Sequence, residues 1–536
     1  MRITVLNGRH GTALLVLWLV AGGQAALAAE GGLAALPTVA PAISCEALAG
    51  AEVSAAVGAD TRLAAAAVTG SACEIEGEIA PHIRFVLKLP LSGWTQRYLQ
   101  TGCGGLCGVL ELRADHAAGC MPFDTGALAL ATTDMGHTGR HMGDGEFGRD
   151  AQARIDFAYR GVHLTALAAQ ALIEKFYGRP ARYRYFSGCS DGGREALMEA
   201  QRFPQDFDGI AAGAPAMNFQ VQNSFYHAWQ SRSNTGPDGQ AILTADRLPL
   251  LHAAVLKACD GLDGKQDGIL DDPRACHFDP ADLLCQAGQP DSSCLSAAQV
   301  DTVRRLYAGA SDAQGRRLVA GGPQYGSELS WRGVFVPDRA DQPIPSTFMA
   351  LGSLQNLIFE QRPANSYSLK DFSFDQATFD HIKPLHVLND ATDPDLGKFA
   401  TQGGKLLLWH GWSDPHISPA NTLAYFSAMR SVMGGVGVAK VARLFMIPGL
   451  YHCQGGEAST EFDVLSPLMA WVESGQAPET LALSSADGSR KSRAPSYQSS
   501  ALSATADRQV WVGADFMRPG YQKQCRVVDQ QLRCDD

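Results

Sequence analysis

The first part of the chain alternates between two hydrophobic patterns. Strand-like runs have alternating or continuous apolar positions, and they cover residues 83–89, 97–100, 127–133 and 182–186. Residues 151–177 instead carry apolar side chains at helical spacing and stop before Gly178-Arg-Pro180. A further helix is predicted for residues 194–202. Strands that alternate with helices favour an α/β fold with a largely parallel sheet.

The pattern changes after Gly213-Ala-Pro215. Residues 217–394 contain four cysteines, an acidic glycine-rich loop and many aromatic side chains, but little alternation of strand and helix. Alternation returns with a short apolar strand at 404–410, a helix at 421–433 and a strand at 442–448. We therefore predict one sheet domain that is interrupted by an inserted lid. Its parts are residues 30–216 (first part of the core), 217–394 (lid) and 395–536 (second part of the core).

The N-terminus has the pattern of a targeting segment. Arg2 and Arg9 are followed by the apolar run Thr12–Val20, and Ala26-Leu-Ala28 fits a small-residue cleavage site. The run is shorter than the roughly 20 residues that span a bilayer. We predict a signal peptide over residues 1–29 and a secreted or periplasmic protein, with an uncleaved anchor as the alternative. No later stretch predicts a membrane helix.

Composition excludes some partners. The chain has 536 residues, 46% of them hydrophobic, and a formal net charge of −11. No basic run of the kind that neutralises phosphates is present, so nucleic acid is not an expected partner. The sequence does not determine the oligomeric state.

The 13 cysteines of an exported chain indicate disulfides rather than thiols. Proximity in the sequence favours four pairs: Cys45–Cys73, Cys259–Cys276, Cys285–Cys294 and Cys525–Cys534. A fifth pair, Cys189–Cys453, would tie together two candidate catalytic loops. Cys103, Cys107 and Cys120 remain, so at least one thiol is expected to be free. A zinc site built on Cys103 and Cys107 lacks an evident fourth ligand.

The candidate nucleophile is Ser190. It lies in Gly188-Cys-Ser-Asp-Gly192, a G-x-S-x-G elbow between a predicted strand and a predicted helix. A serine hydroxyl needs a base and an orienting carboxylate, and Asp414 and His452 each follow a later predicted strand. The order Ser190, Asp414, His452 is that of α/β-hydrolases.

Each candidate has a structural alternative. Ser190 is otherwise an ordinary turn residue, and Asp414 a turn or helix-capping residue. His410, at a strand end, is interpreted as structural, and His416 lies too close to Asp414 in sequence to bridge it easily to Ser190. A fourth histidine, His137, is interpreted as a loop residue rather than a rival base.

These motifs resemble the tannase and feruloyl esterase family, which includes the mono(2-hydroxyethyl) terephthalate hydrolases. The resemblance rests on Gly-Cys-Ser-x-Gly-Gly, the downstream Gly-x-x-Asp and His-Cys, and Asp208-Gly-Ile-Ala-Ala-Gly-Ala-Pro215, and it covers nearly the whole mature chain. It implies an α/β-hydrolase core with a large lid. It also implies that Cys189 and Cys453 form a disulfide beside the triad.

The oxyanion of a tetrahedral intermediate needs two N–H donors. In an elbow, one is the backbone N–H of the residue after the nucleophile, here Asp191. A glycine-rich loop, Thr101–Gly105, is placed to supply the other, and the resemblance aligns Cys103 with that donor.

An acidic loop follows Cys259. It places three carboxylates among glycines, a donor set that suits calcium, although its spacing differs from an EF-hand. By resemblance the loop binds structural calcium through the side chains of Asp260, Asp263 and Asp267 and the carbonyls of Lys265 and Ile269. The alternative is an acidic surface turn.

Together these observations predict a secreted serine esterase. Its substrates would be small esters of aromatic acids (feruloyl, galloyl or related), cleaved through an acyl-enzyme on Ser190. Two alternatives stay open: a serine peptidase with the same triad, and a non-catalytic calcium-dependent binding protein. In the lid, Arg332, Arg339 and Arg362 are candidates to meet a substrate carboxylate.

Overall fold

The computed structural model describes residues 32–112, 127–457, 459–497, 513 and 516–535. The predicted signal peptide (residues 1–29) and Cys120 lie outside the described residues. Among the described helices, none combines the length and the hydrophobicity that a membrane span requires.

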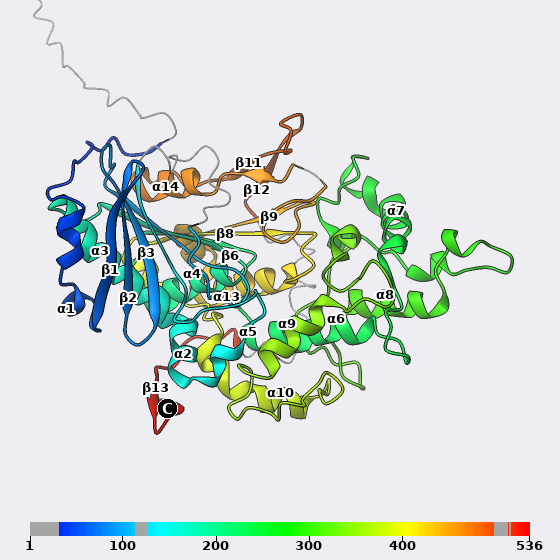
Figure 1. Cartoon of the computed structure of the whole chain (residues 1–536). Coiled ribbons are helices and arrows are strands. Elements are labelled where there is room, and N and C mark those ends of the chain that lie inside the picture. Colours follow the sequence, from blue (N-terminus) through cyan, green and yellow to red (C-terminus); the bar gives the residue numbers. More distant parts are fainter. Residues whose placement is uncertain (1–31, 113–126, 458, 498–512, 514–515, 536) are drawn as a thin grey trace, which may run out of the picture.

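A nine-stranded mixed sheet forms the centre of the molecule (Figure 1), in the order β1-β2-β3-β5-β4-β6-β7-β8-β9. The first four strands in this order pair antiparallel, and the pairs from β5 to β9 are parallel. The strands are β1 Thr61–Thr69, β2 Ala72–Ile79, β3 Ile83–Pro90, β4 Arg97–Thr101, β5 Leu128–Thr133, β6 Tyr183–Cys189, β7 Gly209–Gly213, β8 Lys405–Gly411 and β9 Ala442–Ile447. The fold is that of an α/β-hydrolase, as predicted.

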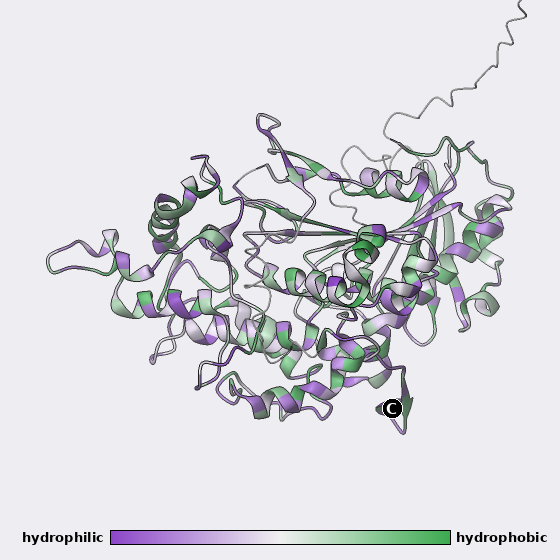
Figure 2. Ribbon diagram, turned by 180° about the vertical axis from the view of Figure 1, so that it is seen from behind, coloured by the Kyte–Doolittle hydropathy of each residue, from purple (hydrophilic) through white to green (hydrophobic). Residues whose placement is uncertain are grey.

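Helices cover both faces of this sheet. The helices α3 Gly161–Tyr177, α4 Asp191–Arg202 and α13 Pro419–Val441 pack on one face, and their apolar side chains join the largest hydrophobic cluster. The helix α14 Leu465–Ser474 packs on the other face, over β7 and β8. Figure 2 shows hydrophobic residues along these inner elements and hydrophilic residues along many outer loops. This layering buries the parallel strands on both sides.

A buried ion pair lies between the sheet and α14 on the second face. Arg97 of β4 donates from Nε and Nη2 to the two carboxylate oxygens of Glu473 in α14, at 2.7 and 2.6 Å. Both side chains are buried, and the hydroxyl of Tyr185 also donates to Glu473 at 2.8 Å. The pair therefore fastens α14 to the strands beneath it with charge-assisted hydrogen bonds.

The chain between β7 and β8 adds no strand to the central sheet and forms a separate group of helices at one side (Figure 1). The third hydrophobic cluster of the molecule lies in this segment and contains residues of α7, of α8 and of the aromatic segment around Trp331. The helices are α5 Phe219–Val221, α6 His227–Ser233, α7 Leu248–Cys259, α8 Ala297–Ala308, α9 Pro345–Leu354, α10 Gln376–Ile382 and α11 His386–Asn389. This is the position of the predicted lid, whose bounds of 217–394 stay a prediction.

The remaining elements lie at the periphery. Two small sheets follow the core in sequence, and short helices flank it. They are β10 Glu461–Phe462, β11 Thr480–Ser484 and β12 Lys491–Pro495; β13 Cys525–Val528 and β14 Gln531–Cys534; and α1 Ser54–Val57, α2 Ala151–Ile155 and α12 Gly397–Thr401.

Two predicted helices differ from the structure. The helix predicted over 151–177 is divided into α2 and α3 by one π-helical turn, Asp156–Arg160, in which Arg160 pairs with Asp156 at 2.7 Å. The helix predicted over 421–433 continues to Val441 beyond a break at Gly434, whose φ of 72° only glycine adopts readily. Hydrophobic spacing continues across the π-helical turn and does not reveal it, whereas the predicted helix end at Met433 falls directly before the break at Gly434.

Candidate active site

Ser190 occupies a strained turn between β6 and α4. Its φ is 65° and its ψ is −120°, a conformation that costs energy for a residue with a side chain. The turn is tight: a Cβ at Gly188 would lie 2.4 Å from the carbonyl oxygen of Gly192. Glycine at these positions therefore lets the elbow form and present the hydroxyl above the sheet, as the motif predicts.

Three predicted residues meet at the carboxyl ends of their strands. His452, after β9, lies with Nε2 2.9 Å from Oγ of Ser190. Its Nδ1 lies 2.7 Å from Oδ2 of Asp414, which follows β8. Both distances allow direct hydrogen bonds, so the imidazole can accept the serine proton while the carboxylate orients it.

Asp414 is completely buried, and four groups surround its carboxylate. Oδ1 accepts hydrogen bonds from the backbone N–H groups of His416 and Ile417, at 2.8 and 3.0 Å. Oδ2 faces His452 and also Nε2 of His410, at 3.2 Å. Burial alone opposes ionisation, but the charge of His452 and hydrogen bonds from both histidines outweigh it and lower the pKa of Asp414. The carboxylate is therefore ionised at any ordinary pH.

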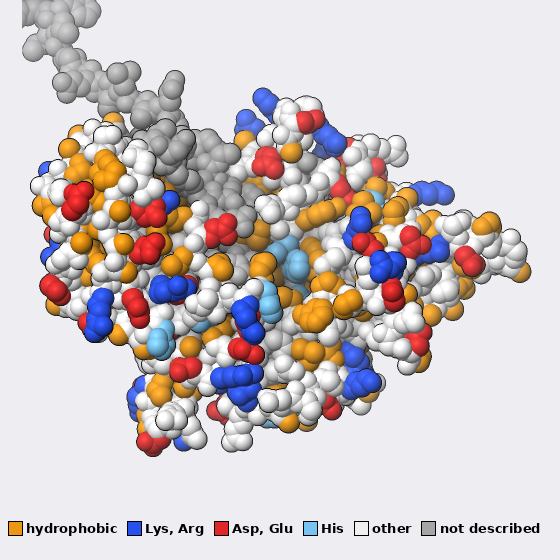
Figure 3. All heavy atoms as spheres, viewed as in Figure 1, with side chains coloured by type: hydrophobic (Ala, Val, Ile, Leu, Met, Phe, Trp, Pro, Cys, Tyr) orange, Lys and Arg blue, Asp and Glu red, His pale blue; other side chains and the backbone are white. Residues whose placement is uncertain are grey.

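The other candidate histidines have structural partners. His410 contacts Oγ1 of Thr422 at 2.7 Å as well as Asp414. Burial lowers the pKa of His416 to about 3, and its ring lies 4.9 Å from the ring of His452. His137 contacts the carbonyl of Leu106 at 2.8 Å. Figure 3 shows histidine side chains in a depression between the sheet domain and the inserted helices.

A disulfide joins the loops of Ser190 and His452, as predicted. Cys189, directly before Ser190, is bonded to Cys453, directly after His452, with their Cα atoms 5.9 Å apart. The four pairs expected from proximity are also present. A sixth disulfide joins Cys103 to Cys107, so neither of these is a zinc ligand or the free thiol.

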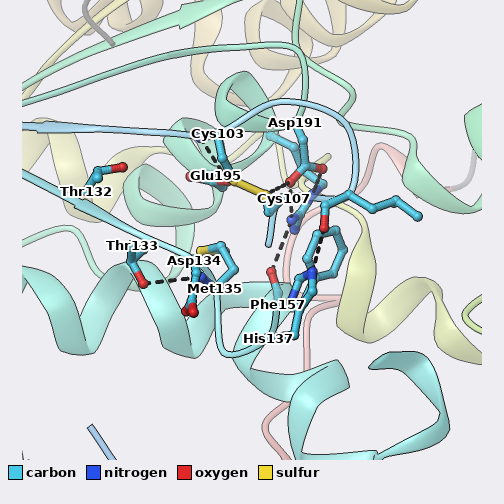
Figure 4. Close-up of a disulfide and its surroundings, with 12 residues drawn as sticks. Cys103, Cys107, Thr132, Thr133, Asp134, Met135, His137, Phe157, Asp191 and Glu195 are labelled. Atoms are coloured by element: carbon cyan, nitrogen blue, oxygen red, sulfur yellow. Dashed lines mark hydrogen bonds and ion pairs between the residues drawn. A yellow bond between two sulfur atoms is a disulfide. The ribbon is translucent and has the colours of Figure 1, made fainter. Parts of the chain in front are cut away.

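On the oxyanion side of the elbow, one of the two predicted N–H donors already has an acceptor within the protein. The N–H of Asp191 is the first of α4, where no intrahelical acceptor exists. The N–H of Cys103, by contrast, is directed at Oε1 of Glu195, 3.4 Å away. Figure 4 shows Glu195 and Asp191 beside the Cys103–Cys107 disulfide. Asp191 and Cys103 as oxyanion donors stay predictions, and Cys103 has a competing acceptor.

Comparison with known proteins identifies the family of this chain. The sequence profile described as "Tannase and feruloyl esterase" matches residues 66–510. The chain belongs to the tannase and feruloyl esterase family. A mono(2-hydroxyethyl) terephthalate hydrolase from Piscinibacter sakaiensis is 34% identical over 484 residues, covering 78% of this chain and 79% of that protein. A probable feruloyl esterase B-2 from Aspergillus flavus is 31% identical, covering 72% and 74% of the two chains.

Solved structures support the same assignment. The crystal structure of feruloyl esterase B from Aspergillus oryzae superposes with a TM-score of 0.68 at 27% identity, covering 80% of this chain and 86% of that one. A tannin acyl hydrolase from Aspergillus niger, at 20% identity and a TM-score of 0.64, shares the fold. As a member of this family, the protein is a carboxylic ester hydrolase.

In the acidic loop of this esterase, the three carboxylates accept hydrogen bonds from backbone N–H groups of the loop itself. Its Oδ1 accepts hydrogen bonds from the N–H groups of Gly268 and Ile269, at 2.9 and 3.2 Å. Asp263 accepts from the N–H of Lys265 at 2.8 Å, and Asp267 from that of Ile269 at 3.2 Å. The oxygen donors are of the type that calcium prefers. In the described residues these three carboxylates are not gathered within 4.8 Å of one another, so the side chains would have to turn inward to share an ion.

Sequence reasoning missed the buried charges behind the elbow. Arg194 is fully buried and donates to both carboxylate oxygens of Asp191, at 2.7 and 2.9 Å. Burial, together with the negative charge of Asp191, raises the pKa of Glu195 well above its usual value. The available signal was the charged pair Arg194-Glu195 in the first turns of a helix that an α/β-hydrolase must bury.

Proposed function

We propose that this protein is an exported esterase that cleaves small esters of aromatic acids through an acyl-enzyme on Ser190. The observation that carries the proposal is the continuous hydrogen-bonded line from Ser190 through His452 to Asp414. His452 takes the serine proton during attack and returns it to the departing alcohol. Asp414, ionised and buried, keeps the imidazole oriented and stabilises its charge.

The acyl group is proposed to be a plant phenolic acid, as in a feruloyl or galloyl ester. The family is described as "Tannase and feruloyl esterase", and a relative carries the name probable feruloyl esterase B-2, which supports a phenolic substrate. Two of the three arginines predicted to meet a substrate carboxylate are paired at the surface: Arg332 with Asp338 and Arg339 with Asp341. Mono(2-hydroxyethyl) terephthalate, which carries a carboxylate, stays the second candidate, because Arg362 donates to the carbonyl of Gln355 rather than to a carboxylate and a relative at 34% identity is named for this ester.

A substrate panel tests this proposal. Methyl ferulate, methyl gallate, chlorogenate and mono(2-hydroxyethyl) terephthalate are compared with wild type and Ser190→Ala, and the matching ferulic amide tests peptidase-type activity. We expect the phenolic esters to be hydrolysed, with a loss of at least about 10³-fold in Ser190→Ala. Activity that survives in this variant, or a preference for the amide, would contradict the proposal.

We also propose that the loop from Asp260 to Ile269 binds a structural calcium ion. The side chains of Asp260, Asp263 and Asp267 would hold it, with the carbonyls of Lys265 and Ile269, and the ion would neutralise their charge. The loop is closed by the Cys259–Cys276 disulfide. Chelator should lower the melting temperature of wild type but not that of Asp263→Asn. Equal melting temperatures with and without chelator would count against the ion.

Export is proposed from the N-terminal pattern together with the disulfides. Six disulfides lie among the described residues, and such bonds persist in oxidising compartments. Cell fractionation with N-terminal sequencing of the mature protein tests both the location and cleavage near residue 29.

A further inference from the structure

A partly buried ionic contact links the inserted segment to the loop that carries His452. His252 of α7 lies with Nδ1 2.7 Å from Oε2 of Glu328, also in the inserted segment. Its Nε2 lies 3.6 Å from Oε2 of Glu457, five residues after His452. Glu457 in turn accepts a hydrogen bond from the hydroxyl of Tyr451, the neighbour of His452, at 2.8 Å. The base loop is therefore connected to the inserted segment through His252.

The same part of the inserted segment contacts the acid loop. Oγ of Ser330 lies 2.8 Å from the carbonyl oxygen of Ser413, the neighbour of Asp414, and 2.6 Å from that of Ser327, so its one proton can be donated to either carbonyl. Ser413 donates back to the carbonyl of Gly326 at 3.3 Å. The N–H of Gly326 donates to Glu328 at 2.8 Å. Residues 326–330 therefore contact both loops. Gly326 and Ser330 contact Ser413, the neighbour of Asp414. Glu328 reaches Tyr451, the neighbour of His452, through His252 and Glu457.

The charges of this network favour a protonated His252. Burial opposes the charge, but the hydrogen bond and charge of Glu328, and the charge of Glu457, outweigh it and raise the pKa of His252. Burial likewise raises the pKa of Glu457, which His252 partly offsets. Three tyrosines among the described residues also face this network: Tyr307, whose hydroxyl donates to Glu328 at 2.5 Å, Tyr325, whose ring lies 4.5 Å from that of Tyr307, and Tyr451. Beyond them, the charge of Asp279 acts on Tyr325.

We propose that His252, as an imidazolium between Glu328 and Glu457, is a positioning residue that holds the loop of His452 in its catalytic place. The inference rests on the proposed function, because it requires His452 to be the base. The sign on the alkaline side follows from the raised pKa of His252: its charge is fully present below about pH 6.5, the ordinary value for histidine, and is lost as the pH rises through the raised value. On the acid side, protonation of Glu457, whose pKa burial raises, removes the other charge of the pair.

The test compares His252→Gln with His252→Lys, which keeps a positive charge to about pH 10. A matched control is His163→Gln: His163 also contacts a carboxylate, Asp206 at 2.6 Å, but it lies on α3 away from the triad. The readouts are kcat and KM on an ester that wild type hydrolyses, measured from pH 6 to 9, and the rate at which a fluorophosphonate labels Ser190. Melting temperatures identify variants that fail to fold.

We expect His252→Gln to lower kcat and the labelling rate about 5- to 20-fold near pH 6.5, with KM changed less than about twofold. Wild type should lose kcat on the alkaline side, whereas His252→Lys should keep the wild-type rate without that alkaline loss. Wild-type kcat and labelling in His252→Gln, or an equal loss in His163→Gln, would overturn the inference. If wild type itself is not labelled at Ser190, the proposed function fails first, and the inference falls with it.

Discussion

Removing the Cys189–Cys453 disulfide should separate its effect on folding from its effect on catalysis. The two cysteines are 264 positions apart. In the chain-entropy model, a closed loop of this length contributes about 5.5 kcal/mol to stability at 25 °C, which is an upper value because native strain and residual structure reduce it. The bond also lies directly beside both Ser190 and His452, so it limits their relative movement. The perturbation is Cys189→Ala combined with Cys453→Ala.

The expected catalytic effect follows from the 2.9 Å contact between Oγ of Ser190 and Nε2 of His452. A misplacement of about 1 Å at a reacting pair can cost about 100-fold in rate. We expect kcat to fall at least tenfold, which is about 1.4 kcal/mol of barrier. The assay is steady-state hydrolysis of a phenolic ester at a temperature where circular dichroism shows both proteins folded.

The matched control removes a distant disulfide, Cys285–Cys294, whose cysteines are 9 positions apart. The same model gives about 2.5 kcal/mol for this shorter loop. The control should lose stability and keep its kcat. If the double variant at Cys189 and Cys453 remains folded with unchanged kcat, the disulfide does not align the triad, and the reasoning is refuted.

Two further substitutions probe buried charges. Asp414→Asn should lower kcat by about 10⁴-fold, because the imidazole loses its orienting carboxylate. Because the pKa of Asp414 is lowered, the stability that its charge contributes is present above about pH 3.9 and is lost only in stronger acid. The difference in kcat between wild type and variant should therefore persist at every ordinary pH. Hydrolysis rates from pH 5 to 9 check this, and a difference that vanishes near pH 5 would contradict it. Glu473→Ala should destabilise the fold by about 3–5 kcal/mol, because Arg97 is left charged and buried. Urea unfolding measures this loss, and a change below about 1 kcal/mol would show that water reaches Arg97.

Much of the candidate active site was predictable because its parts are local motifs that follow strand ends. The elbow around Ser190 has a sequence signature, and Asp414 and His452 follow apolar runs that are hard to interpret as anything but buried strands. The carboxyl ends of neighbouring parallel strands meet at one edge of a sheet, so the three residues were expected to converge. Hydrophobic pattern and turn chemistry carry this information directly.

Other features depend on long-range contacts that no local pattern encodes. The hairpin of β1 and β2 was not predicted, because β1 is rich in alanine and largely exposed, so it lacks a strand pattern. The Cys103–Cys107 disulfide needs a turn that brings two Cα atoms within 5.4 Å, and the spacing alone left it undecided. The contact of His252 with Glu457 joins residues about 200 positions apart, and only the folded structure shows it.

The order of strands in the sheet has a consequence for how the protein can be divided. Strand β7 ends at Gly213, and its neighbour β8 begins only at Lys405. A fragment that stops before β8 would leave β7 with one row of backbone donors and acceptors unpaired, a template for joining to another chain. Ser190 would be present in such a fragment, but it would lie beside an unpaired sheet edge. Expression of the first half alone should therefore yield aggregates, and complementation between two halves should require that they be produced together.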